Sequence, residues 1–279
     1  LRNQQITILL YLPDNVDLES VLSIEVGITK SNSIAAYSAE MKGRNFIYVD
    51  YGLYLYLLDW IKLALYGFRI SEFNRLNENI TITEPIKTGV QLFLKIVNIV
   101  VFNGDVRLLP PVLFTLHEDD AKMQKIITSN CINFILAHEY SHVIFAHRKF
   151  DAPDHPYDIL NSHKQEYKAD LHAMNWIANV RSGSKEETVV KDNSDSEHIS
   201  GDNILEYGQF EIINSVSLTF SFFDLFDNVE QRLRIIKNKE LSRKEKRAKH
   251  SHPSFKLRKD NIISKVSEEA NLELSKYAD

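Results

Sequence analysis

The segment that decides the fold runs from Ile132 to His147 and reads INFILAHEYSHVIFAH. Its apolar residues surround the run HEYSH at positions 138–142, and the sequence predicts a buried helix here. Two histidines four residues apart, His138 and His142, lie on one face of a helix, about one turn from each other. This spacing lets both imidazoles reach a single Zn²⁺ and puts Glu139 beside the open position of the metal.

A catalytic zinc site takes a third protein ligand and keeps one position for water. The metzincin pattern would need glycine at 145 and histidine at 148, but these positions hold Phe145 and Arg148. His147 is one residue short of that spacing and is turned off the ligand face. The other solution is an acidic residue on a following helix, where Glu166 and Asp170 share a face. One of them can bind the metal while the other accepts a hydrogen bond from a ligand imidazole.

The pattern HExxH followed by ExxxD resembles the signature of the gluzincin zinc metallopeptidases. Within that group, the chain is similar to soluble relatives of the CAAX-prenyl protease and HtpX-type family. His147 recurs in some of its members, and the run from His252 and Pro253 to Arg258 is similar to the family's H-P-x-x-x-x-R element. In size, motif position and general character, the chain also resembles phage-exclusion peptidases of the Lit type.

These resemblances imply a zinc-dependent endopeptidase with one Zn²⁺ per chain and a protein or peptide substrate. The metal ligands would be His138, His142 and Glu166, with Asp170 behind them as a hydrogen-bond acceptor. Zinc lowers the pKa of a bound water from about 15.7 towards 7, and Glu139 would act as the general base that takes its proton. The resemblance nominates His252 or Arg258 to support the oxyanion, and both are therefore named as catalytic residues.

A second hypothesis is a non-catalytic binding or regulatory protein on a gluzincin scaffold, in which the metal is structural or lost. Glu139 favours the enzyme, because a purely structural zinc site needs no base at that position. An enzyme of this kind fits a restricted-target regulatory or phage-defence protease. Fold does not fix the substrate, so its identity stays open.

The composition favours a globular protein in a reducing compartment. Of 279 residues, 44% are hydrophobic and 25% are charged, which are ordinary globular values. The single cysteine, Cys131, excludes an internal disulfide and is expected to be a buried core residue. Residues 1–12 lack the features of a signal peptide, although the chain starts at Leu1 and an upstream piece can be missing. Polar residues interrupt each of the most apolar stretches, so we expect no transmembrane segment and a cytoplasmic protein.

Positive charge is concentrated between Arg232 and Lys259, where 12 Lys and Arg stand against two Glu. One interpretation is a patch for nucleic acid or another anionic partner. We favour a solvated helix and turn, because aromatic residues that would stack on bases are absent between Phe226 and Phe255. Part of this charge, at His252 and Arg258, is expected to serve the active site.

We predict an α+β fold that is predominantly α-helical: zincin-like, with a small N-terminal β-sheet and a helical C-terminal half. Residues 1–181 would form the catalytic region, 182–202 a polar flexible loop or linker, and 203–279 a helical region packed on the catalytic part. Strands are expected at Ile6–Leu12, Asn45–Tyr51 and Ile99–Phe102, and a helical turn at Ala35–Met41. Helices are expected at Leu53–Tyr66, Thr88–Val97, Ala121–Phe150, Ser162–Val180, Asn203–Asp227, Val229–Lys249 and Ser254–Tyr277.

Two further expectations concern particular side chains and one strand edge. We expect five aromatic residues of the C-terminal half to lie in the hydrophobic core: Phe210, Phe220, Phe222, Phe223 and Phe226. The turn signal at 103–105 predicts a hairpin just before the motif helix. We expect residues 99–116 to supply the sheet edge that holds an extended peptide over the metal.

Overall fold

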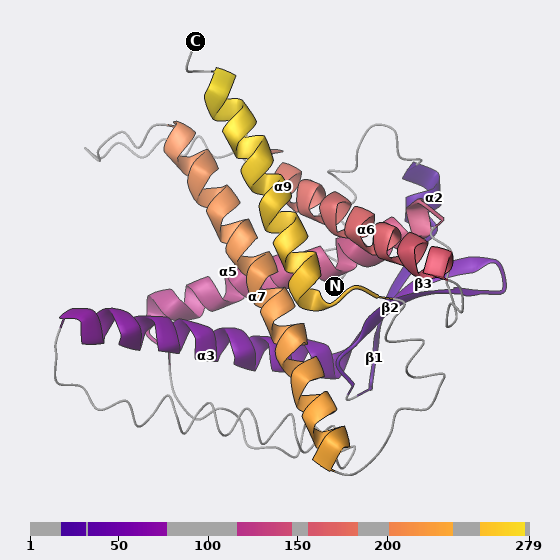
Figure 1. Ribbon diagram of the computed structural model, residues 1–279, viewed down its shortest axis with the longest axis horizontal. Helices are drawn as coiled ribbons and strands as arrows, with labels where there is room; N and C mark the ends of the chain where they lie inside the picture. Colours follow the sequence, from indigo (N-terminus) through magenta and orange to yellow (C-terminus); the bar gives the residue numbers. More distant parts are fainter. Residues whose placement is uncertain are drawn as a thin grey trace.

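The computed structural model of the chain describes residues 18–31, 33–76, 116–146, 156–183, 201–236 and 252–276. A small sheet lies at one end of the molecule and long helices make up the rest of the described part (Figure 1). The predicted class, α+β and predominantly α-helical, is confirmed. In chain order the elements are α2 (Leu18–Leu22), β1 (Glu25–Thr29), β2 (Ala36–Met41), β3 (Arg44–Asp50), α3 (Tyr51–Leu76), α5 (Glu118–Ile144), α6 (Pro156–Gly183), α7 (Gly201–Ile236) and α9 (Phe255–Lys276).

The three strands are arranged in the order β1-β3-β2, with β1 parallel and β2 antiparallel to β3. A two-residue turn joins β2 to β3, and both of its residues, Lys42 and Gly43, have positive φ angles of 53° and 73°. This is the conformation that matches the twist of a tight hairpin. The predicted strand at Asn45–Tyr51 is confirmed as β3, whereas the helical turn predicted at Ala35–Met41 is wrong. Alanine, glutamate and methionine favour a helix there, but pairing with β3 decides the conformation.

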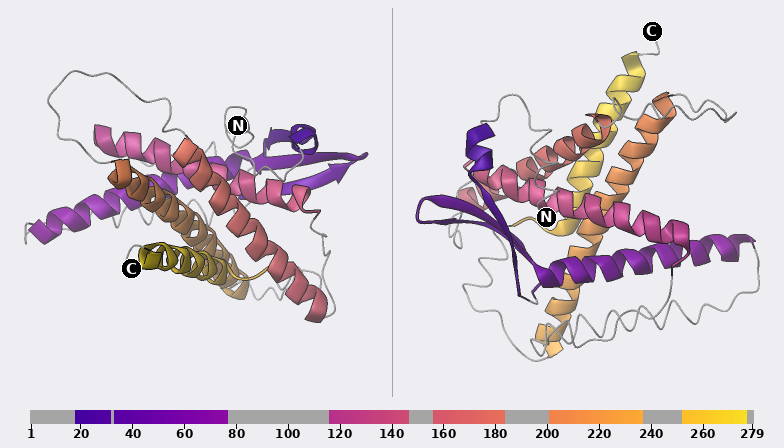
Figure 2. Two further views of the ribbon diagram at one scale, coloured as in Figure 1. Left: turned by 90° about the horizontal axis from the view of Figure 1, so that it is seen from above. Right: turned by 180° about the vertical axis from the view of Figure 1, so that it is seen from behind.

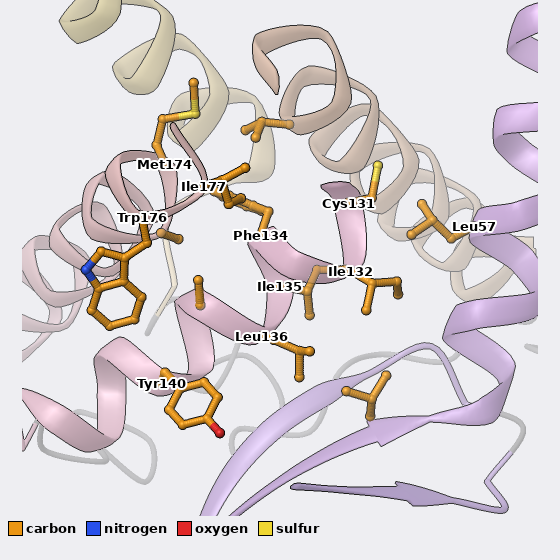
Figure 3. Close-up of a cluster of buried hydrophobic side chains, with 14 of the residues drawn as sticks. Leu57, Cys131, Ile132, Phe134, Ile135, Leu136, Tyr140, Met174, Trp176 and Ile177 are labelled. Carbon is orange, nitrogen blue, oxygen red and sulfur yellow. The ribbon is translucent and has the colours of Figure 1, made fainter. Parts of the chain in front are cut away.

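Helix α5, which carries the HEYSH run, is the centre of the core. It packs against α3, α6, α7, β2 and β3. Between Ile127 and Ser141 nearly every side chain is buried, whichever way it points. Figure 3 shows side chains of α5, among them Ile132 and Phe134, gathered with residues of α3 and α6 in one cluster. A helix enclosed in this way has little freedom to shift, so its histidines are held rigidly.

The helix α7 lies beside α9 (Figure 2). Helix α7 packs on both α5 and α6, whereas α9 packs on α6. The predicted separate helices at Asn203–Asp227 and Val229–Lys249 are wrong at their boundary, because α7 continues unbroken through Asn228 to Ile236. The Asn228 amide donates to the Asp224 carbonyl oxygen one turn earlier, at 2.8 Å, and so stays on the helix instead of starting a new one. Residues 237–249 lie outside the described part.

The aromatic side chains expected in the core are found there where they are described. Phe220 and Phe222 are buried, and Phe223 and Phe226 are partly buried against the clusters of buried side chains. Cys131 is fully buried, as predicted, and its thiol donates to the Ser215 carbonyl oxygen of α7 at 3.3 Å. Burial raises the pKa of this thiol to about 12. The side chain of Phe210 lies outside the described residues.

Helix boundaries differ from the predictions by several residues. Helix α5 ends at Ile144 instead of Phe150, because the chain leaves the helix through Ala146, whose φ angle is 47°. Helix α6 starts earlier than predicted, at Pro156, a residue suited to the first position of a helix. Helix α3 follows β3 directly and extends past Tyr66 to Leu76.

Some predicted elements lie outside the described residues: the strands at Ile6–Leu12 and Ile99–Phe102, the helix at Thr88–Val97, the hairpin around 103–105, nearly all of the sheet edge expected at 99–116 and most of the loop at 182–202. The division into three regions stays a prediction. Within the described ranges, none of the helices combines the length and apolar character that a bilayer span requires.

Candidate metal centre

Three side chains from two helices meet at one point. His138 and His142 come from α5 and Glu166 from α6, and their ligand atoms lie within 4.8 Å of one another. The two Nε2 atoms of the histidines are 3.0 Å apart. The carboxylate oxygens of Glu166 lie 3.5 Å from Nε2 of His138 and 3.4 Å from Nε2 of His142. The three residues predicted as metal ligands are therefore together.

These separations fit a zinc ion. Ligands placed 2.0–2.1 Å from a tetrahedral centre are about 3.3 Å from each other. The two Nε2 atoms are 3.0 Å apart, and each lies at a similar distance from a Glu166 oxygen: 3.5 Å to Oε2 for His138 and 3.4 Å to Oε1 for His142. Two imidazoles and one carboxylate are also the donor set of a catalytic zinc site with an open position. The site lies in the last turns of α5, where the negative end of the helix dipole favours a cation.

Asp170 contacts and orients His138, the first candidate ligand. Its Oδ1 atom lies 2.9 Å from Nδ1 of His138, so this nitrogen donates to Asp170 and leaves Nε2 free to face a metal. Burial and the charge of Arg258 lower the pKa of His138, but Asp170 and Glu166 outweigh them and the pKa is raised. Burial raises the pKa of Asp170, yet Arg258 and the hydrogen bond from His138 bring it below its ordinary value.

Glu139, the predicted general base, lies on α5 between the two histidines and is only partly buried. Its carboxylate accepts a hydrogen bond from the backbone of Ser38 in β2. Burial raises the pKa of Glu139, and the neighbouring Glu166 adds to this effect, against the opposing charges of His138 and Arg258. A carboxylate with a raised pKa is a better proton acceptor than an ordinary surface glutamate.

The segment from His252 to Arg258, which leads into α9, also reaches the site, where both of these residues contact Glu166. The Ser254 hydroxyl accepts a hydrogen bond from the Leu257 backbone N–H at 3.3 Å, which caps the first turn of α9. This start fixes Arg258 one turn into the helix, facing α6. Nδ1 of His252 lies 2.9 Å from Oε1 of Glu166, yet 61% of the His252 side chain is exposed. His252 therefore touches a candidate ligand and faces solvent at the same time.

The ionised form of the Glu166 carboxyl is stabilised by three neighbouring side chains. Burial by itself raises the pKa of this carboxyl, but Arg258, His252 and His138 outweigh it, so its pKa lies well below the ordinary range. Nη1 of Arg258 is 3.0 Å from Oε2 of Glu166. Glu166 is thus an ionised carboxylate at neutral pH, which is the form that binds a metal.

The end of α5 is also tied to α6. The Phe145 ring stacks on the His172 ring with centroids 4.2 Å apart, and the Lys168 ammonium lies 4.9 Å from the Phe145 centroid. These contacts join the residue three positions after His142 to the helix that carries Glu166. They help to keep the ligands from the two helices in register.

Two contacts of the site were missed by the sequence analysis. The bond from Ser38 to Glu139 depends on strand register, for which no local signal exists. The rings of Phe220 and Phe255 lie 5.3 and 5.7 Å from the Arg258 guanidinium carbon, and the sequence marked Phe220 only as core. Much of the basic stretch at 232–259 lies outside the described residues, but Arg258 is buried within the site, in line with the expectation that part of this charge serves it.

Residues 107–198 of the chain match the family model of Peptidase U49. This stretch is about a third of the chain and contains α5 and α6 with His138, Glu139, His142, Glu166 and Asp170. No curated protein and no solved structure matches the chain. The match supports a peptidase family and a proteolytic function. The resemblance to the CAAX-prenyl protease and HtpX-type family stays a prediction.

Proposed function

We propose that the chain is a zinc-dependent endopeptidase of the gluzincin type, with His138, His142 and Glu166 as the ligands of one Zn²⁺. The observation that carries the proposal is the close approach of two Nε2 atoms, 3.0 Å apart, beside a buried carboxylate. Two imidazole nitrogens brought this close beside a carboxylate are the arrangement that two ligands of one metal ion adopt. The peptidase similarity of the same two helices supports the same conclusion.

The chemistry divides between the metal and this chain's own residues. Bound Zn²⁺ would polarise the peptide carbonyl and make a water molecule more acidic. Glu139 accepts the proton of the attacking water and passes it to the departing amine. In this proposal His252, which is exposed beside Glu166, would donate to the carbonyl oxygen as negative charge develops on it.

The strand β2 is our proposal for the edge on which an extended peptide binds. The backbone N–H of Asp50 donates to the Ala35 carbonyl oxygen at 2.9 Å, so residues of odd number in β2 bond to β3. Backbone groups alternate along an antiparallel strand, and Ala36, Ser38 and Glu40 therefore direct theirs to the free edge of the described sheet. The bond from Ser38 to Glu139 supports this, because it brings that edge beside the general base.

The test is the metal content of purified protein, compared between wild type and His142→Ala. We expect one zinc per chain in the wild type and a large loss in the variant. Incubation of the zinc-loaded wild type with a degenerate peptide library, read by mass spectrometry, should then reveal internal cleavage. A folded wild type that binds no zinc after reconstitution contradicts the proposal. Zinc binding without any cleavage favours the non-catalytic alternative.

A further inference from the structure

Arg258 holds both acidic residues of the site at once. Its Nε and Nη2 atoms lie 2.8 and 2.5 Å from the two carboxylate oxygens of Asp170, which is a bidentate pair. Its Nη1 atom lies 3.0 Å from Oε2 of Glu166. One guanidinium group therefore links the candidate ligand Glu166 to the acceptor that orients His138.

The shape of the guanidinium group is essential to this arrangement. Its planar fork offers donors in fixed directions, so that it can pair with one carboxylate through two atoms and still reach a second. A lysine ammonium carries the same charge at a single point and has no such fork. Replacement of Arg258 by lysine would keep the positive charge and lose the link between the two carboxylates.

Arg258 is fixed in place by its surroundings. It is 7% exposed, and the rings of Phe220 and Phe255 lie within 6 Å of its guanidinium carbon. Nη2 lies 3.3 and 3.4 Å from the two ring nitrogens of His138. Because Nδ1 of His138 already donates to Asp170, these near-equal distances indicate that the guanidinium packs against the imidazole ring.

We propose that Arg258 is a positioning residue, which fixes the geometry of Glu166 and His138 through its contacts with both carboxylates, and that it does not touch the substrate. This differs from a role at the oxyanion. Its burial keeps Arg258 away from the solvent-facing side, where the exposed His252 lies. The inference rests on the proposed function for its metal, but the link between Arg258 and Asp170 exists without one.

A purely electrostatic role of Arg258 and a positioning role predict opposite changes in zinc affinity when Arg258 is replaced. If Arg258 acted only as a positive charge, its removal would leave two more basic carboxylates near the dication, and Arg258→Gln would bind zinc more tightly. If Arg258 positions the ligands, both Arg258→Gln and Arg258→Lys should bind zinc about 10–100-fold more weakly, the range typical of groups that orient metal ligands. The sign of the change in the zinc Kd therefore distinguishes the electrostatic role from the positioning role.

The experiment measures the zinc Kd of metal-free protein by competition with a chromophoric chelator. Wild type is compared with Arg258→Lys, Arg258→Gln and Lys256→Gln, the last an exposed residue of the same helix whose Kd should be unchanged. Circular dichroism of each metal-free variant checks that it is folded. Weaker binding in both Arg258 variants is expected. An unchanged or tighter Kd with reduced kcat would overturn the proposal in favour of an oxyanion role.

A double-mutant cycle in the metal-free protein gives an independent measurement. Arg258→Lys, Asp170→Asn and their combination are compared by chemical unfolding. We expect the double variant to lose much less stability than the sum of the single variants, because each change breaks the same pair. Additive losses would refute the link between the two residues. If wild type binds no zinc, the proposed function fails, and this cycle still decides whether Arg258 fixes Asp170.

Discussion

Glu139 shows how one residue acquires its chemistry from its surroundings. Burial raises its pKa, and the neighbouring Glu166 acts in the same direction. The Ser38 backbone holds its carboxylate towards the sheet edge. A glutamate at the other end of the same helix, Glu118, is exposed and pairs with Lys122. Two glutamates of one helix thus differ in their surroundings: one is exposed and paired with a lysine, and the other lies beside the candidate metal site.

Glu139→Gln should lower kcat for peptide cleavage by at least about 10²–10⁴-fold, because the amide cannot accept the proton of the attacking water. Zinc content should stay at the wild-type value, since Glu139 is not a ligand. The measurement is single-turnover cleavage of a peptide identified in the library. The matched control is Glu118→Gln, which should cleave at the wild-type rate. Retained cleavage by Glu139→Gln would remove it from the mechanism.

At the scale of single elements, β2 carries the proposal for peptide binding. The N–H of Glu40 points to the outer edge of β2, whereas that of Ala39 faces β3. Proline is tolerated in an edge strand only where its missing N–H would face outwards. The two neighbouring positions therefore offer a matched pair for substitution.

We expect Glu40→Pro to fold and to raise the KM for a cleaved peptide by about tenfold, the equivalent of one lost backbone hydrogen bond. Ala39→Pro should instead lower the stability of the sheet, because it removes a bond to β3. Thermal unfolding and steady-state kinetics of both variants check this. Equal KM values for Glu40→Pro and wild type would argue that the peptide binds elsewhere.

The start of α9 is a second element on which the site depends. Ser254→Ala removes the oxygen that accepts from the Leu257 N–H, and loss of a cap of this kind costs about 1 kcal/mol. The free energy of unfolding from urea titration should fall by that amount. Ser264→Ala, at an exposed position within the same helix, is the control and should cause no comparable loss. No difference between the two variants would show that the hydroxyl is not a cap.

The elements differ in how far the sequence could predict them. Helices α5 and α6 were predicted because apolar spacing and the spacing of His138, His142 and Glu166 agree. Strand β2 was missed because its residues favour a helix and only its pairing with β3 makes it a strand. The break predicted near Asn228 was wrong, since an asparagine can bond back to its own helix. Contacts such as that of Ser38 with Glu139 depend on long-range register, which no local pattern encodes.

At the scale of the whole molecule, the site concentrates opposite charges in the interior. Asp170 and Glu166 are buried with depressed pKa values, and Arg258 is buried between them. A carboxyl whose pKa is lower in the folded protein than in the unfolded chain stabilises the fold at pH values above its unfolded pKa. That stabilisation is lost as the pH falls through the folded-state value.

The metal-free protein should therefore lose stability as the pH falls from about 4, near the ordinary pKa of an aspartate, towards the depressed values. Asp170→Asn should be less stable at neutral pH and should depend less on pH in the acid range. Urea midpoints of metal-free wild type and variant between neutral pH and pH 3 measure this. Parallel curves for the two proteins would contradict the assignment to Asp170.

Because Arg258 follows the other site residues in the sequence, its contact with Asp170 forms late during synthesis of the protein. Asp170 and Arg258 are 88 residues apart, so a ribosome completes α5 and α6 well before it reaches the arginine. A nascent chain therefore carries His138, His142 and Glu166 without the group that fixes their geometry. If Arg258 positions the ligands as proposed, full metal affinity, and with it the proposed capacity to cut neighbouring nascent proteins, would develop only after translation has passed residue 258.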